Sequence, residues 1–357
     1  MGGDALDKIS RLASNAPLLS ASHNDPASVL AGCDSYDDDL GIYEQTAVEA
    51  RRIIYLLLAD RTNSPFLSST QHRSNNKNQS SWQKLFRALL SSMAISDLPA
   101  RDFILTCTTT SKVLLPILFK VVTVSDIQDT IESISTHALV RNLMLNGPSA
   151  YSCYTESQPI ARTHIGAEKA SNIFDIEYLL LCTMPSSLGK SAQTKAILQQ
   201  NDFIVYESLK MIIVALKRLG RLLQDINDCE GLDDQKGVLG AIEEAALQRL
   251  PDVQSLLSVR SKYDFYSGKN KSSTEVTRVV GNLVLESLTL YGLYLSRSID
   301  EVKFDWMKIL PPDVKTFYSI PEALQFQTLY TAKSMLFSDS VSILNPVANF
   351  ACFDDRI

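Results

Sequence analysis

Apolar residues recur at spacings of three and four through most of this chain of 357 residues. The clearest case runs from Asp202 to Asp228, where the stripe is formed by Val205, Leu209, Ile212, Ile213, Leu216, Leu219 and Leu223. Such spacing places side chains on one face of an α-helix, whereas a half-buried strand alternates every second residue. The run MIIVAL at 211–216 is apolar on nearly every side, so we expect this helix to be central and packed on several faces.

Similar stripes predict helices over most of the rest of the chain. They are expected at 39–60, 82–95, 100–109, 111–122, 126–145, 168–183, 191–200, 237–250, 251–259, 273–297 and 321–337. The small residues Gly281, Ser287 and Gly292 would allow a neighbouring backbone to approach the helix at 273–297 closely. The pattern contains no convincing alternating strands. Gly accounts for 14 of the 357 residues, a share below the average usage of about 7%.

The sequence therefore predicts an all-α fold. Two arrangements fit: a globular multi-helix domain, or an α-solenoid of helix pairs stacked in the pattern of armadillo or HEAT repeats. The likeness to those repeats is one of pattern, because no residue types recur at a fixed spacing of about 34–47 residues.

Polar and turn-forming segments divide the chain into regions. The stretch at 61–80 is rich in Ser, Asn and Gln and has almost nothing to bury, so it is expected to be a surface loop. We predict a weakly ordered acidic arm at 1–38, an N-terminal helical region at 39–145 that contains this loop, a link at 146–166, a C-terminal helical region at 167–340 and a tail at 341–357.

The charge is unevenly distributed. The net charge is −6, and residues 1–60 carry all of it, with ten acidic and four basic residues. The rest of the chain is neutral overall. This balance disfavours a domain held to nucleic acid by general electrostatics, although a local basic face is compatible with it.

Cysteine placement and hydropathy bear on the compartment. The six cysteines are spread through the chain without the spacing of a disulfide framework, so we expect reduced thiols in a cytoplasmic or nuclear protein. No window approaches the ~18 apolar residues of a membrane span, and the N-terminus fails the myristoylation pattern. The expectation is an intracellular, soluble protein with no membrane span and no lipid anchor.

Three patterns contain residue types that could carry chemistry. Gly189–Ser191 reads Gly-Lys-Ser, the tail of a phosphate-binding loop, but Met184 stands where the first glycine is required and the preceding segment reads as a helix. Asp37–Asp39 fit helix capping better than cation binding, because no second acidic motif faces them. A pairing of Cys107 with His137 lacks any recognisable nucleophile motif. We therefore predict no catalytic residues, no metal ligands and no cofactor.

The most informative polar feature is a basic face on the helix at 202–228. Lys210, Lys217 and Arg221 are seven and four residues apart and so share a face opposite the apolar stripe, and Arg218 adjoins them. A solvated helix face explains this pattern. The functional interpretation is a docking surface for an acidic partner segment or a nucleic-acid backbone.

The predicted function is a non-catalytic helical scaffold or adaptor subunit of an intracellular multiprotein complex, which binds partner proteins through a helical groove. Two alternatives stay open. One is a helical nucleic-acid-associated protein of the nucleoprotein kind, and the other is an all-α enzyme whose active site follows no recognised spacing.

Overall fold

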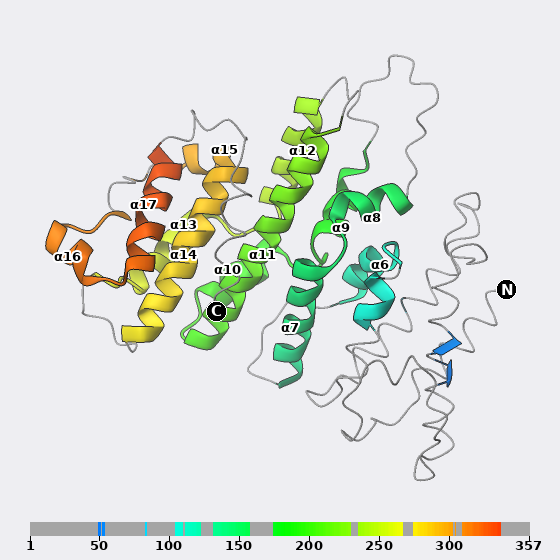
Figure 1. The fold of residues 1–357 in the computed structure, drawn as a ribbon, viewed down its shortest axis with the longest axis horizontal. Helices are drawn as coiled ribbons and strands as arrows, with labels where there is room; N and C mark the ends of the chain where they lie inside the picture. Colours follow the sequence, from blue (N-terminus) through cyan, green and yellow to red (C-terminus); the bar gives the residue numbers. More distant parts are fainter. Residues whose placement is uncertain are drawn as a thin grey trace, which may run out of the picture. The chain divides into compact units, whose positions relative to one another are not determined.

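The computed structural model describes residues 49–50, 52–53, 83, 104–109, 111–122, 131–157, 174–229, 235–266, 274–302, 304 and 309–336. Among these residues the regular elements are all helices and no strand occurs (Figure 1). The predicted all-α fold class is thereby confirmed, while the solenoid arrangement stays a prediction. The arm at 1–38, the loop at 61–80 and the tail at 341–357 lie outside the described residues.

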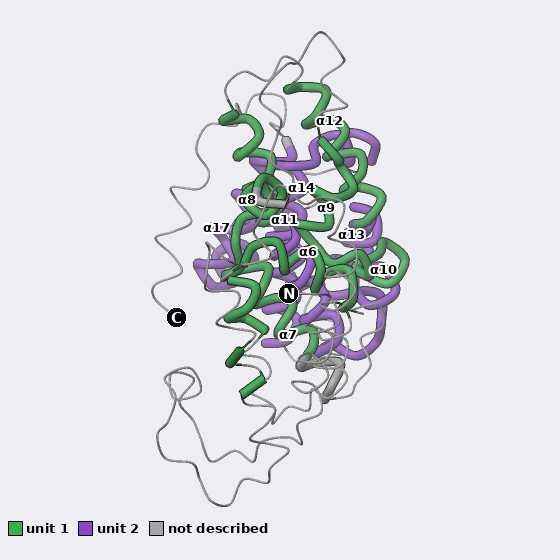
Figure 2. Tube along the Cα trace, turned by 90° about the vertical axis from the view of Figure 1, so that its right-hand side faces the viewer, with its two compact units in different colours: residues 1–192, 218–249 green, residues 193–217, 250–357 purple. Residues whose placement is uncertain are grey.

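The chain forms two compact units (Figure 2). Unit 1 comprises residues 1–192 and 218–249, and unit 2 comprises residues 193–217 and 250–357. The long helix α11, Asp202–Asn227, contributes its first part to unit 2 and its last part to unit 1. Helix α10, Lys190–Ile197, begins in unit 1 and ends in unit 2.

Unit 1 is built around helix α9. Its labelled helices are α6 (Leu114–Val121), α7 (Ile131–Asn146), α8 (Ala150–Ser157), α9 (Ile176–Thr183) and α12 (Gln235–Leu247). Helix α9 contacts α6, α8 and α12, and it buries Leu179, Leu180 and Cys182. Asp175 caps it, because its side chain accepts a hydrogen bond from the amide of Tyr178 at 3.0 Å.

Unit 2 contains a layer of three packed helices. Its elements are α13 (Val253–Lys262), α14 (Thr274–Tyr294), α15 (Ser296–Asp300), α16 (Val314–Ser319) and α17 (Glu322–Leu336). Helix α14 contacts both α13 and α17, and Figure 1 shows it beside them. The fully buried Tyr291 of α14 donates a hydrogen bond from its hydroxyl to the carbonyl of Pro251 at 2.6 Å, which satisfies its polar atom inside the core.

The described helices agree with the predicted segments to within several residues, except for short elements, while the predicted helices at 39–60 and 82–95 lie almost entirely outside the described residues. Helix α8 lies inside the segment predicted as a link at 146–166, and α16 was not predicted at all. The predicted helix at 111–122 starts at Leu114, so Pro116 lies in the first turn, where its missing amide hydrogen removes no intrahelical bond.

Gly281 confirms the expectation that small residues on α14 admit a neighbour. A Cβ atom at this position would lie 2.5 Å from Cδ1 of Phe265 and 3.1 Å from the carbonyl oxygen of Tyr263. The ring of Phe265 has little room to move, since it packs against Tyr266 with ring centroids 4.5 Å apart and carries the Arg260 guanidinium 4.5 Å above it. Close packing at this point therefore depends on the absence of a side chain.

We expect Gly281→Ala to lower the free energy of unfolding by about 1–3 kcal/mol, because overpacking forces side chains and backbone to shift. Urea denaturation followed by circular dichroism would measure the change. Gly189→Ala is the matched control, since nothing lies within 4 Å of the Cβ that it would add. Equal stability of the two variants would contradict the packing described here.

Candidate docking surfaces

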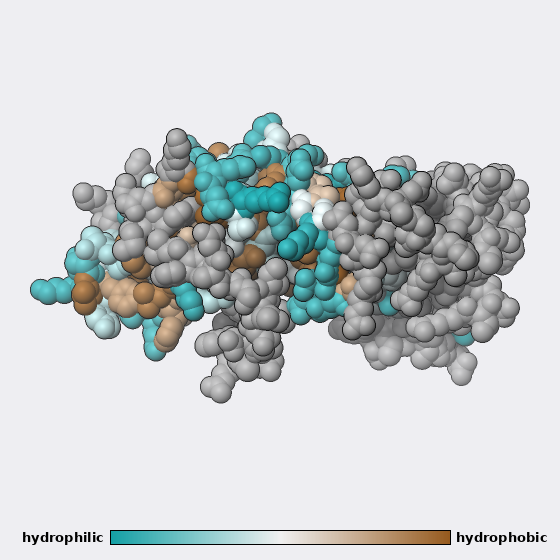
Figure 3. Space-filling model, turned by 90° about the horizontal axis from the view of Figure 1, so that it is seen from above, coloured by the Kyte–Doolittle hydropathy of each residue, from teal (hydrophilic) through white to brown (hydrophobic). Residues whose placement is uncertain are grey.

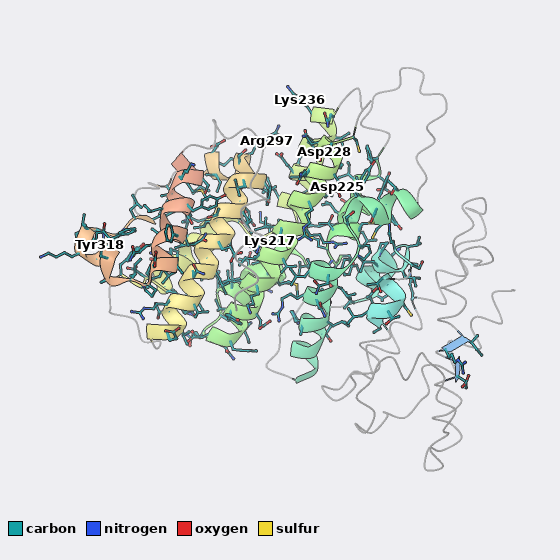
Figure 4. All side chains as sticks on the ribbon, in the orientation of Figure 1. Lys217, Asp225, Asp228, Lys236, Arg297 and Tyr318 are labelled. Carbon is teal, nitrogen blue, oxygen red and sulfur yellow. The ribbon has the colours of Figure 1, made fainter. Side chains whose placement is uncertain are left out.

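The unit 2 part of the predicted basic face contains Lys210 and Lys217, and both have local partners. The Lys210 ammonium lies 4.4 Å from the centroid of the Tyr206 ring, one turn earlier on α11. The Lys217 ammonium lies 2.9 Å from a carboxylate oxygen of Glu286 on α14. Figure 4 labels Lys217 on α11. The positive charge at Lys217 is therefore largely balanced within the unit.

In unit 1, Arg221 is exposed and Arg218 is not. Arg218 is only 3% exposed, so the prediction that it belongs to a basic surface is wrong. Its guanidinium donates hydrogen bonds to three main-chain carbonyls: to Met144 at 3.2 Å, to Pro148 at 2.6 Å and to Cys182 at 3.0 Å. Arg218 is an internal residue that ties three segments of unit 1 together.

The charge of Arg218 is stabilised by helix ends. Met144 and Cys182 lie in the last turns of α7 and α9, where carbonyl oxygens have no intrahelical donor and the helix dipole is negative. Burial lowers the pKa of Arg218, because the charged form loses its water. The carbonyls offset part of that cost and receive the donors that they lack.

A different group of side chains is exposed at the start of α11. Phe203 is 45% exposed, and Leu198, which follows α10, is 48% exposed. Phe203 and Lys210 are seven residues apart on α11 and so lie on one face of the helix. We call Leu198, Phe203, Tyr206 and Lys210 the α11 surface. It combines exposed apolar area with one cation, all within unit 2.

Sequence reasoning found Lys210 but overlooked Phe203. The signal was present: the buried stripe contains Val205 and Leu209, and Phe203 falls about 160° away from Val205 around the helix. A large aromatic residue opposite the buried stripe of an amphipathic helix is a candidate for an exposed contact.

Helices α16 and α17 form a second exposed apolar area of unit 2. Val314 and Tyr318 of α16 are 69% and 72% exposed, and Phe326 and Leu329 of α17 are 64% and 50% exposed. Apolar side chains are visible at this end in the surface view (Figure 3), and Figure 4 labels Tyr318 on α16. Asp313 caps α16. Its carboxylate accepts a hydrogen bond from the amide of Thr316 and another from the Thr316 hydroxyl, and these two bonds lower the pKa of Asp313.

The buried face of α17 is unusually polar. Thr328 and Thr331 are fully buried and Ser334 nearly so. Their hydroxyls have partners: Thr331 donates to the carbonyl of Gln327 at 2.7 Å, and Thr328 lies 3.1 Å from the Tyr266 hydroxyl. The helix therefore directs hydroxyl groups inward while two of its largest apolar side chains, Phe326 and Leu329, face outward.

Two of the three patterns that could carry chemistry lie among the described residues, and their surroundings do not favour that chemistry. Gly189–Ser191 follow helix α9 and not the buried strand that a phosphate-binding loop requires. Burial raises the pKa of Cys107, which keeps a neutral thiol, and His137 is also buried. Asp37–Asp39 lie outside the described residues.

The described residues contain neither a cluster of metal ligands nor a helix suited to span a membrane. Within them no His, Cys, Asp and Glu side chains gather in a group of three or more that could hold a metal ion. None of the helices in this part of the chain is both long and apolar enough to cross a membrane.

Comparison with known proteins returned no match to a family model, to a curated protein or to a solved structure. Its function is therefore inferred from the surfaces described above.

Proposed function

We propose that the protein is a non-catalytic scaffold or adaptor subunit of an intracellular multiprotein complex, cytoplasmic or nuclear, and that it binds a partner protein through the α11 surface. The observation that carries this proposal is the exposure of Phe203 on the same face of α11 as Lys210, with Leu198 also exposed just before this helix. Aromatic residues are enriched where proteins bind one another, and they supply much of the binding energy when a partner covers them.

The composition of the α11 surface defines the partner's chemistry. Phe203 and Leu198 would be covered by apolar side chains of the partner, and Lys210 would face an acidic residue. An amphipathic helix with an acid near its apolar stripe meets both requirements. The proposed surface is shorter than the predicted basic face, because it leaves out Lys217, which already pairs with Glu286, and the buried Arg218.

The two alternatives receive less support from the same residues. A nucleic-acid backbone needs several available cations, whereas Arg218 is buried and Lys217 is paired with Glu286. A cysteine nucleophile needs a lowered pKa, whereas burial raises the pKa of Cys107 and of Cys182.

Affinity purification of the tagged full-length protein from its own cells tests the proposal. We expect a partner at near-stoichiometric amount with the unaltered chain, and at least a tenfold reduction with Phe203→Asp combined with Lys210→Glu, since the change removes an apolar anchor and reverses a charge. The control is Val279→Asp, at an apolar residue of α14 that is 39% exposed and outside the α11 surface.

Recovery of the partner should be unchanged in the control, and all three proteins should have the same helical content. The proposal fails if the unaltered chain recovers no stoichiometric partner. It also fails at this surface if the double variant recovers as much partner as the control does.

A further inference from the structure

Four exposed residues on the outward side of α17 form a stripe whose spacing is the same in both directions along the helix. Glu322, Phe326, Leu329 and Lys333 are all exposed and are separated by four, three and four residues. This spacing places them along one side of the helix, as in the seam of a coiled coil. We call these four residues the α17 stripe. The spacing reads the same from either end.

A second copy of α17 that runs in the opposite direction therefore brings an oppositely charged or apolar residue against each residue of the stripe. If two copies of α17 pack antiparallel about a two-fold axis, Glu322 of each copy faces Lys333 of the other, and Phe326 faces Leu329. Each contact then occurs twice, as the symmetry of an isologous interface requires. A parallel arrangement would instead place Glu322 against Glu322 and Lys333 against Lys333.

The interior of α17 supports an external contact for this side. Thr328, Thr331 and Ser334 face the unit, where they are buried and hydrogen-bonded. The apolar area of Phe326 and Leu329 is consequently left on the outer side, where water covers it at a free-energy cost. Val314 and Tyr318 of α16 extend the exposed apolar area next to α17, since the two helices contact each other.

We propose that the protein self-associates as a two-fold symmetric dimer through antiparallel packing of the α17 stripe. Helices with this seam pack at a shallow angle of about 20°, which keeps both ends of a short stripe in contact. The interface is small, because the stripe spans only about three helical turns. We expect a dissociation constant on the order of 10–100 µM, as for interfaces at the low end of the size range.

The proposed dimer forms through α17 and not through the α11 surface. A scaffold that dimerises in this way would present two α11 surfaces to its partners. The self-association would stand if no partner protein bound to α11.

Sedimentation equilibrium of the full chain between about 5 and 500 µM tests the dimer. Glu322→Lys and Lys333→Glu, made singly, each replace two attractive pairs by two repulsive ones, and we expect each to weaken association about tenfold. The double variant E322K/K333E exchanges the charges and should restore association to within about twofold of the unaltered chain. Phe326→Asp should abolish it.

Two further measurements make the result specific. An equimolar mixture of the two single variants should associate more strongly than either alone, because one contributes only lysines and the other only glutamates. Phe203→Asp, on the α11 surface, should leave the dissociation constant unchanged. This control separates failure of the dimer from failure of the proposed function.

The proposal is overturned if the unaltered chain remains a monomer at 500 µM. It is also overturned if the single charge variants associate as well as the unaltered chain, which would indicate a parallel register or another surface. A double variant as weak as the single variants would exclude the pairing of residue 322 with residue 333. Because all four residues are exposed, circular dichroism should show the same helical content for every variant.

Discussion

Arg218→Met is expected to lower the free energy of unfolding by about 2–5 kcal/mol. Methionine fills much of the space of arginine but donates no hydrogen bond. The carbonyl oxygens of Met144, Pro148 and Cys182 would then lose their donor in a buried environment, at a cost of about 1–3 kcal/mol each. The loss is smaller than the sum, because the variant no longer has to bury a cation.

Urea denaturation would measure the overall loss, and hydrogen exchange would locate it. Because Met144 and Cys182 lie in the last turns of α7 and α9, the amides of these turns should exchange faster in the variant. Arg221→Met is the matched control, since Arg221 is exposed on the same helix, and it should change stability by less than about 0.5 kcal/mol.

Arg218→Lys distinguishes charge from geometry. Lysine keeps the cation but offers one ammonium group in place of a planar fork, so it cannot reach three separate carbonyls. We expect Arg218→Lys to lower the free energy of unfolding, but by less than Arg218→Met does. If Arg218→Met were as stable as Arg221→Met, the three carbonyls would not depend on Arg218, and its internal role would be refuted.

The sequence predicts the helices well because their cause is local. In α11 the spacing of Leu209, Ile212 and Leu216 requires one face of a helix to be buried, and all three side chains are fully buried. The same reasoning places α14 and α17 to within a few residues. The predicted close approach at Gly281 also follows from a local property, the absence of a side chain.

The position of Arg218 could not be predicted because its partners are remote. Residues 217 and 218 are neighbours at the edge of the buried stripe, and either long side chain could turn toward water or inward. The decision rests on carbonyls that lie 36 to 74 residues away in the chain. No periodicity within α11 contains that information.

Two further features of the structure have related causes. Helix α8 is short and polar, and it is held by tertiary contacts: Tyr154 packs on Phe174 and Tyr178, and its hydroxyl accepts a hydrogen bond from the amide of Asp175. On α17, apolar content alone would place Phe326 inward. Threonine side chains occupy the buried face instead. Thr331 can be buried because its hydroxyl donates a hydrogen bond to a carbonyl of its own helix.

Met211→Ala and Ile213→Ala are each expected to lower the free energy of unfolding by about 2–4 kcal/mol. The effect is expected at both positions although the two side chains point in opposite directions. Consecutive positions differ by about 100°, so residues two apart are about 200° apart around the helix. Met211 is 2% exposed and Ile213 is 4% exposed, and the whole run from 211 to 216 is buried. Truncation on either side therefore leaves a cavity in a packed environment.

The comparison of the two variants tests the central position of α11 more directly than either alone. Urea denaturation of Met211→Ala, Ile213→Ala and the exposed control Gln224→Ala would supply the three values, with a change below about 0.5 kcal/mol in the control. A helix that lay on a surface would tolerate one of the two truncations, since one face would be hydrated. A near-neutral result at either Met211 or Ile213 would therefore show that neighbours do not enclose this helix on both sides.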